Sequence, residues 1–214
     1  MSYSKTLGVA VLAATFVTAL IGAGPASAAD RLCETNTTPC ASPVAANSIL
    51  KAEATDVIFT GDTEITCASS AITLKVTSNT GAANPTGEVT ALTWNICKDI
   101  THGVSCHDEV TQNLPYHMEV TTTGSPTTPD LTIKPHSGGG SPGVTFLCGI
   151  FVRCIFQASD LTLPIDVGSP ASITANDFRL EAVDESGIPC PEEVFLDAKY
   201  VLVSPTSSLF VSSS

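Results

Sequence analysis

The chain contains few aromatic and few basic residues. Aromatic side chains make up 6% of its 214 residues and include a single tryptophan, and 9 lysines and arginines stand against 21 aspartates and glutamates. The net charge of −12 repels polyanions, which excludes nucleic acid and anionic membrane surfaces as partners. The shortage of aromatic rings argues against a surface that stacks on sugars.

Sequence motifs of catalysis are also missing. The nucleophile elbow G-x-S-x-G does not occur, no calcium loop of the D-x-D-x-D-G type is present, and no histidine or cysteine spacing matches a standard zinc site. We therefore predict a protein that is not an enzyme, with no catalytic, cofactor-binding or metal-binding residues and no cofactor.

Only one long hydrophobic run exists, from Leu7 to Gly22. At about 16 residues it is shorter than the roughly 20 that a membrane-spanning helix needs. Lys5 precedes it and the small residues Ala26, Ser27 and Ala28 follow, which is typical of a secretory signal peptide. We predict cleavage after Ala28 and a secreted chain without a membrane span, free outside the cell or loosely associated with the cell envelope. Cleavage removes one lysine and no acid, so the net charge becomes −13.

All eight cysteines follow this signal. An even number of cysteines in an exported chain predicts disulfides, because thiols oxidise outside the reducing cytosol. Two strands flanking Gly149 would bring Cys148 opposite Cys154, and consecutive strands would join Cys97 to Cys106. Elimination then leaves two further pairs, Cys33 with Cys40 and Cys67 with Cys190. The main alternative joins Cys67 to Cys97 and Cys106 to Cys190.

The mature chain is long enough for one domain, and no charge run or long linker divides it. We expect a leader segment over 29–55, with a short helix over 45–54, and a single domain over 56–214. Alternating apolar residues and abundant Thr and Val predict strands over most of that domain. The expected strands are 57–59, 72–76, 88–96, 116–120, 131–134, 144–157, 171–174, 178–183, 194–203 and 208–211.

Many short strands separated by turn-forming residues favour an all-β, antiparallel β-sandwich, immunoglobulin-like or jelly-roll-like and stapled by disulfides, with a barrel as the alternative. The pattern also predicts a core. Leu92, Trp94 and Ile96 alternate along one face of a strand and should be buried, together with Phe146 and Tyr200.

Several segments carry a family resemblance. The sequences ITCASSAITLKV and PTGEVTALTWNIC, between Phe59 and Cys97, resemble a group of uncharacterised secreted actinobacterial-type β proteins that contain disulfides. The later segments VTFLCGIFVRC and GIPCPEEVFLDAKYVL are similar to the hairpin cysteines and closing strand of that group. The likeness covers 56–211 and implies compartment and fold, and it transfers no catalytic residue or cofactor.

Three clusters of chemically active side chains are candidate sites. His102, His107 and Asp108 surround Cys106 and could ligate a metal, although an exposed polar loop is the favoured interpretation. His136 and Ser137 precede three glycines, which need only make a turn. The adjacent carboxylate pairs point to opposite faces of a strand and cannot act together as they would in a glycosidase; they are Asp108 with Glu109, Asp184 with Glu185, and Glu192 with Glu193.

Three classes of function remain. We favour a secreted, non-enzymatic protein with a structural or interaction role outside the cell or at the cell envelope, in contact with an extracellular or envelope protein or glycan. The alternative is a module that binds carbohydrate or another small ligand, which would require Trp94, Tyr116 or Tyr200 to be exposed beside polar groups. The second alternative is a secreted hydrolase, which would require a deep pocket with two titratable groups.

Overall fold

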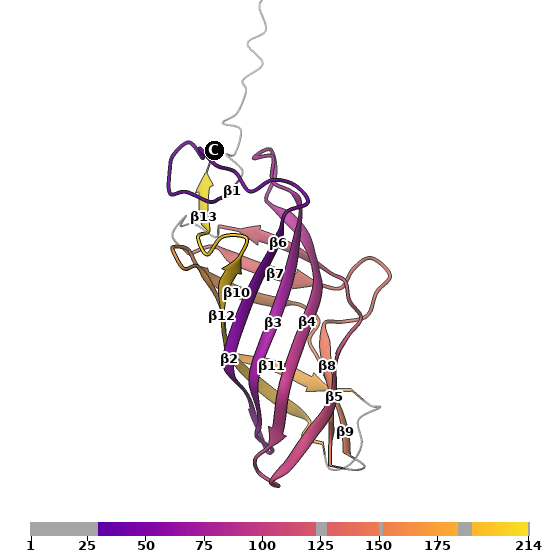
Figure 1. Cartoon of the computed structure of the whole chain (residues 1–214). Coiled ribbons are helices and arrows are strands. Elements are labelled where there is room, and N and C mark those ends of the chain that lie inside the picture. The colour runs from indigo at the N-terminus through magenta and orange to yellow at the C-terminus, as the bar shows by residue number, and fades with distance from the viewer. Residues whose placement is uncertain (1–29, 123–127, 150–151, 184–189, 214) are drawn as a thin grey trace, which may run out of the picture.

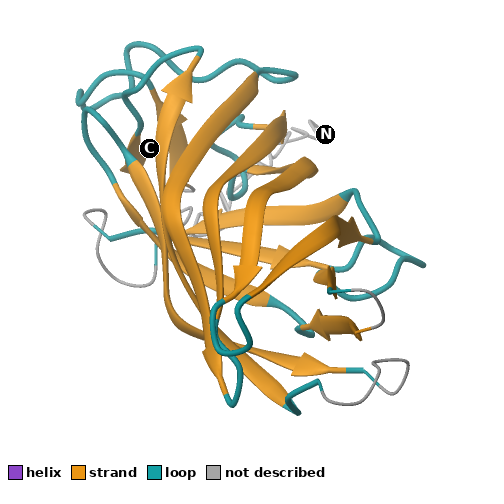
Figure 2. Ribbon diagram, turned by 60° about the horizontal axis from the view of Figure 1, so that its bottom comes forward, coloured by secondary structure: helices purple, strands orange, loops and turns teal. Residues whose placement is uncertain are grey.

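The computed structural model describes residues 30–122, 128–149, 152–183 and 190–213. The expected signal peptide, 1–28, lies outside these residues. Within them the secondary structure consists of strands joined by loops, and Figure 2 shows this directly. No helix long and apolar enough to cross a membrane is found in the described part of the chain.

Thirteen strands run through the described residues, and most of the expected strands are among them. Their bounds are β1 (Asp30–Cys33), β2 (Ile49–Gly61), β3 (Ile65–Ser78), β4 (Thr86–Asp99), β5 (Val104–Gln112), β6 (Tyr116–Thr121), β7 (Asp130–Lys134), β8 (Gly143–Cys148), β9 (Val152–Gln157), β10 (Leu161–Asp166), β11 (Ser172–Ala182), β12 (Glu193–Ser204) and β13 (Phe210–Ser213).

Eleven of these strands form one antiparallel sheet in the order β10-β7-β6-β4-β3-β2-β12-β11-β9-β8-β5, and β10 also pairs with β11 and β4 with β5. The strands β4, β3, β2, β12 and β11 are long, and two groups of shorter strands, β6-β7-β10 and β5-β8-β9, each connect the outer two of them. In Figure 1 the group β6-β7-β10 crosses behind the upper part of β2, β3 and β4. The prediction of an all-β, antiparallel, disulfide-stapled sandwich is confirmed.

The burial alternation changes phase midway along β2, β3 and β4. In the β2–β3 ladder Thr55 pairs with Ser69 and Val57 with Cys67, and in the β3–β4 ladder Cys67 pairs with Cys97. The residues next to these pairs, Asp56, Ala68 and Ile96, therefore lie in one exposed row across the three strands. We call this the phase-shift row. Asp56 and Ile96 have positive φ angles of 55° and 54°, and the inward-facing positions on either side of the row are three residues apart instead of two.

This phase shift corrects one expectation about the core. Trp94 is buried, as predicted, but Leu92 is only half-buried and Ile96 is 72% exposed. A strict alternation would put Ile96 on the same face as Trp94. The positive φ of Ile96 breaks the alternation, and its side chain points to solvent. The predicted burial of Phe146 and Tyr200 is confirmed.

Aromatic rings fill the centre of the core. Phe59 packs edge-to-face against Trp94, with ring centroids 5.3 Å apart, and against Phe146 at 5.0 Å. Phe146 in turn lies 6.5 Å from Phe156. The cluster therefore joins the long strands β2 and β4 to the short strands β8 and β9.

Every one of the eight cysteines lies in a disulfide, as predicted, but only one expected pair is correct. Cys33 is joined to Cys40, as expected, whereas the predicted pairs Cys67–Cys190, Cys97–Cys106 and Cys148–Cys154 are wrong. The other bridges are Cys67–Cys97, Cys106–Cys148 and Cys154–Cys190. The alternative considered from the sequence was right about Cys67–Cys97 and wrong about Cys106–Cys190.

The sheet register explains these corrections. On the β3 side of β4, Cys97 lies directly opposite Cys67. On its β5 side, Lys98 pairs with Ser105, so the next residues along this ladder are Cys97 and Cys106. Cys106 in turn lies opposite Cys148 on β8. Four cysteines thus form a row across β3, β4, β5 and β8, and each inner one has two neighbours. In the β8–β9 hairpin, Cys148 lies opposite Val152 and Cys154 opposite Phe146, so these two cysteines are not cross-strand partners.

The first described residues contribute strands. β1 pairs with β13, and β2 begins at Ile49 and runs past the expected domain boundary at residue 55, so the helix expected over 45–54 is wrong. Buried Leu50, Ala52 and Ala54 alternate along β2. The expected strand that begins at Cys106 is part of β5, whereas the sequence pattern missed β1 and β10; Pro164 within β10 lowers the strand propensity of that segment.

Candidate functional site

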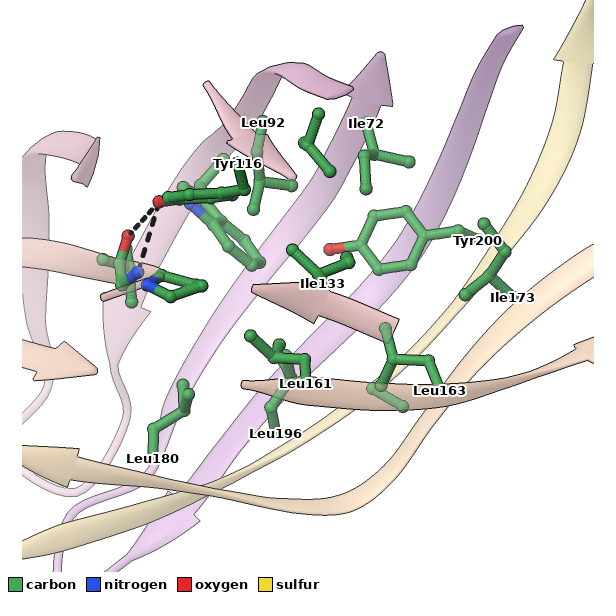
Figure 3. Close-up of a pocket in the computed structure, with 16 residues that line it drawn as sticks. Ile72, Leu92, Tyr116, Ile133, Leu161, Leu163, Ile173, Leu180, Leu196 and Tyr200 are labelled. Carbon is green, nitrogen blue, oxygen red and sulfur yellow. Dashed lines mark hydrogen bonds between the residues drawn. The ribbon is translucent and has the colours of Figure 1, made fainter. Parts of the chain in front are cut away.

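An apolar cavity of about 50 Å³ lies between the long strands and the two short groups. Figure 3 shows side chains from the long strands and from the short strands pointing into it. Sixteen residues line it, and nearly all are aliphatic or aromatic: Ile72, Val89, Leu92, Trp94, Tyr116, Ile133, Pro142, Gly143, Val144, Leu161, Leu163, Ile173, Ala175, Leu180, Leu196 and Tyr200.

Tyr200 brings one hydroxyl to the cavity wall. Its Oη lies 2.9 Å from the Oγ of Ser70, on β3, and both side chains are buried. Burial raises the pKa of the Tyr200 phenol, and the hydrogen bond with Ser70 lowers it by less. The hydroxyl is therefore protonated and already paired at neutral pH.

Tyr116 supplies a second hydroxyl, at the start of β6. Its Oη accepts a hydrogen bond of 3.2 Å from the Gly143 backbone N–H and donates to the carbonyl of Gln112. Burial raises the pKa of this phenol too, and the backbone hydrogen bond at Gly143 opposes that effect. The dashed lines at Tyr116 in Figure 3 are its two hydrogen bonds with the Gly143 backbone, so this hydroxyl joins the two short strand groups.

Trp94 completes the polar part of the wall. Its indole Nε1–H donates to the Thr111 hydroxyl at 3.2 Å, and that hydroxyl donates to the carbonyl of Leu92. Trp94, Tyr116 and Tyr200 are thus all buried and all engaged in hydrogen bonds. The exposed ring beside polar groups that a sugar site would require is not found at these three positions.

A second hollow, of about 280 Å³, lies at the end of the molecule where β4 turns into β5. Its wall includes Asp99 and His102. The Asp99 carboxylate accepts hydrogen bonds from the His102 backbone N–H at 3.0 Å and faces the His102 Nδ1 at 2.8 Å. The hydrogen bond to the backbone shows that Asp99 holds the turn. His102 was a candidate from the sequence pattern, whereas Asp99, three residues before it, was not.

The other candidate residues do not converge. His107 is exposed on β5, and the side chain of Asp108 lies outside the described residues. Nε2 of His136 lies 4.0 Å from Oε1 of Glu88. No group of three histidine, cysteine or carboxylate side chains suited to a metal ion is found in the part of the chain that the structure describes.

The carboxylate pairs show no cooperation either. Glu193 forms an ion pair with Arg179, while Glu192 is exposed beside it. Asp184 and Glu185, and the side chain of Glu109, lie outside the described residues. In the described part of the chain these carboxylates therefore do not come together, whereas side chains from several strands converge on the apolar cavity.

Comparison with known proteins does not add a family. No family model, no curated protein and no solved structure matches this chain.

Proposed function

We propose that this chain is a secreted, non-enzymatic protein whose β-sandwich serves a structural or interaction role outside the cell or at the cell envelope. The observation that carries the proposal is the disulfide framework. All eight cysteines are bridged, and three of the four bridges join positions 30 to 42 residues apart. Such a framework persists in an oxidising compartment and would be reduced in the cytosol.

The signal-peptide pattern and the charge support the same proposal. Lys5, the apolar run and the small residues before Ala29 form an export signal, and the acidic balance keeps an extracellular protein soluble. The partner we propose is a protein or glycan of the envelope or the extracellular space. The resemblance to secreted actinobacterial-type β proteins is compatible with this role.

Intact-mass analysis of the protein from the culture medium tests the proposal. We expect a chain that begins at Ala29, gains two hydrogens per bridge on reduction and has no titratable thiol when denatured without reductant. A matched chain lacking 1–28 should remain inside the cell with free thiols. A chain in the medium that retains Leu7 to Gly22, or free thiols in the exported protein, would contradict the proposal.

The internal cavity favours a second candidate function, the binding of a small ligand. Ligand sites are concave and mostly apolar with a few placed polar groups, and this cavity has that composition. Its polar atoms come from Trp94, Tyr116 and Tyr200, which are already hydrogen-bonded. The candidate ligand is therefore apolar, and a sugar is disfavoured.

A further inference from the structure

The hollow of about 280 Å³ at the end of the molecule is separate from the internal cavity. It lies where β4 turns into β5, at the lower end of the view in Figure 1, and none of the described residues lines both spaces. An apolar cavity of about 150 Å³ is known to bind benzene. The hollow is larger than that, so its volume accommodates a six-membered ring with a small substituent.

Most of the wall of this hollow is apolar. Cys148 and Cys154 line it, and each of them belongs to a disulfide. Sulfur makes favourable contacts with the edge of an aromatic ring, so this wall suits a flat aromatic ring better than a saturated one. The aliphatic side chains of the wall are Ile65, Val104, Val152 and Pro191.

Thr63 brings a buried hydroxyl without a partner to the hollow. It lies in the turn between β2 and β3, lines the hollow and is 9% exposed. No hydrogen bond of this hydroxyl to another described residue is found. Nε of Arg31 is the one enclosed side-chain polar atom without a partner in that part of the chain, so the Thr63 hydroxyl is accessible from the hollow. A ligand that displaces water from this hydroxyl must replace the lost hydrogen bond.

His102 places a second polar group at the opening. Its side chain lines the hollow and is 54% exposed, so the hollow is open to solvent at this residue. The Asp99 carboxylate lies 2.8 Å from Nδ1 of His102. An imidazole that donates its Nδ1–H to a carboxylate presents its other nitrogen, Nε2, as a hydrogen-bond acceptor.

The two turns that carry these groups are joined to each other. The Glu64 backbone N–H donates to the Thr101 hydroxyl at 2.8 Å, and the Ile100 backbone N–H donates to the Glu64 carbonyl at 2.9 Å. Glu64 is the neighbour of Thr63, and Thr101 is the neighbour of His102. A donor hydroxyl and an acceptor nitrogen are therefore held on adjacent turns before a ligand arrives, which lowers the entropic cost of binding.

Charge favours a neutral ligand. The net charge of −12 repels anions. Asp99 is the only acidic residue on the wall among those that the structure describes, and both of its oxygens are bonded to His102, so a cation finds no free carboxylate there. A neutral hydroxyl group loses less hydration free energy than an ion when it leaves water.

We propose that this hollow binds a neutral monocyclic phenol. The ring lies against the aliphatic side chains and the two disulfides, and the phenolic hydroxyl accepts a hydrogen bond from Thr63 and donates one to Nε2 of His102. This inference goes beyond both functions proposed above, because it depends neither on secretion nor on the internal cavity.

Isothermal titration calorimetry of the mature, oxidised protein with 4-methylphenol tests the proposal. We expect saturable binding, and we expect toluene, which has the same ring and methyl group without the hydroxyl, to bind at least tenfold more weakly. The saturated analogue 4-methylcyclohexanol should bind at least threefold more weakly than 4-methylphenol. The same is expected of the anion 4-methylbenzoate and of the cation 4-methylbenzylamine.

Three variants place the binding in the hollow. Thr63→Val keeps the shape of the side chain and should weaken 4-methylphenol binding about tenfold without a change for toluene. Thr90→Val, at an exposed position on β4 away from the hollow, is the matched control and should leave binding unchanged. Val104→Phe fills the hollow and should abolish the binding of both compounds. If either Thr63→Val or Val104→Phe does not fold, the other one decides.

Three results would overturn the proposal: no saturable binding of 4-methylphenol while the protein stays folded, an affinity for toluene, the saturated analogue or either ion that equals or exceeds the affinity for 4-methylphenol, or unchanged affinity in folded Thr63→Val or Val104→Phe. None of these results would alter the intact-mass measurements. Failure of this inference is therefore distinguishable from failure of the proposed secretion.

Discussion

The hydrogen bond between Tyr200 and Ser70 can be isolated by a double-mutant cycle. The two hydroxyls are 130 residues apart in sequence, lie 2.9 Å from each other, and are buried between β12 and β3 beside the cavity. Tyr200→Phe removes one hydroxyl and leaves the ring in place. Ser70→Ala removes the other with little change in volume.

Each single substitution should cost more than the bond itself is worth. A buried hydroxyl left without its partner costs about 1 to 3 kcal/mol, whereas removal of both partners is close to neutral. We therefore expect Tyr200→Phe and Ser70→Ala each to lower the free energy of unfolding by about 1 to 3 kcal/mol. The double variant should lose less than the sum of the two, by about 1 kcal/mol or more.

Urea denaturation of the oxidised protein, followed by far-ultraviolet circular dichroism, measures these free energies. Ser69→Ala, on the half-buried neighbour of Ser70, is a matched control and should change the free energy of unfolding by less than about 0.5 kcal/mol. Strictly additive losses in the double variant would refute the argument, because they would show that the two hydroxyls do not depend on each other.

Three further predictions follow from other features. Trp94→Ala should lower the free energy of unfolding by about 3 to 5 kcal/mol, because the indole is buried against Phe59; a change below 1 kcal/mol in urea denaturation would place the ring outside the core. Ile96→Gly should raise the melting temperature, since Ile96 is exposed at a positive φ that glycine adopts freely, while Ile49→Gly, at an exposed position on β2 without a positive φ, should lower it; the same sign for both would refute the role of the φ angle. Burial raises the folded-state pKa of Tyr200 above the ordinary value of about 10, so its contribution to stability is complete below pH 10 and is lost as the pH rises above it. The urea concentration at the denaturation midpoint should therefore decrease as the pH is raised above 10. The decrease should be smaller in Tyr200→Phe.

Local sequence patterns were sufficient for the class of the fold. Alternating apolar residues along β3, β6 and β12 predict strands because side chains on a strand point to opposite faces, and this requires no knowledge of the partner strand. The burial of Trp94 and Phe146 follows from the same pattern and from their size. The bridging of all eight cysteines was expected from their even number.

The expectations about Ile96 and about the disulfide partners depended on register, and these went wrong. Ile96 is exposed because β2, β3 and β4 change phase together at Asp56, Ala68 and Ile96, and a pattern read from one strand does not show such a shift. Cys97 has Cys67 on one side and approaches Cys106 on the other, so sequence spacing could not decide between them. The disulfide partner of a cysteine is decided by which strand lies on each side of its own strand.

The sequence by itself determined the all-β class, the disulfide chemistry and much of the core, since each depends on local alternation, composition or the count of thiols. Only the tertiary structure decided the disulfide partners, the contact of Tyr200 with Ser70 and the apolar cavity. These features join residues from strands far apart in the chain. Their positions depend on how the sheet folds over itself, which is a property of all the strands together.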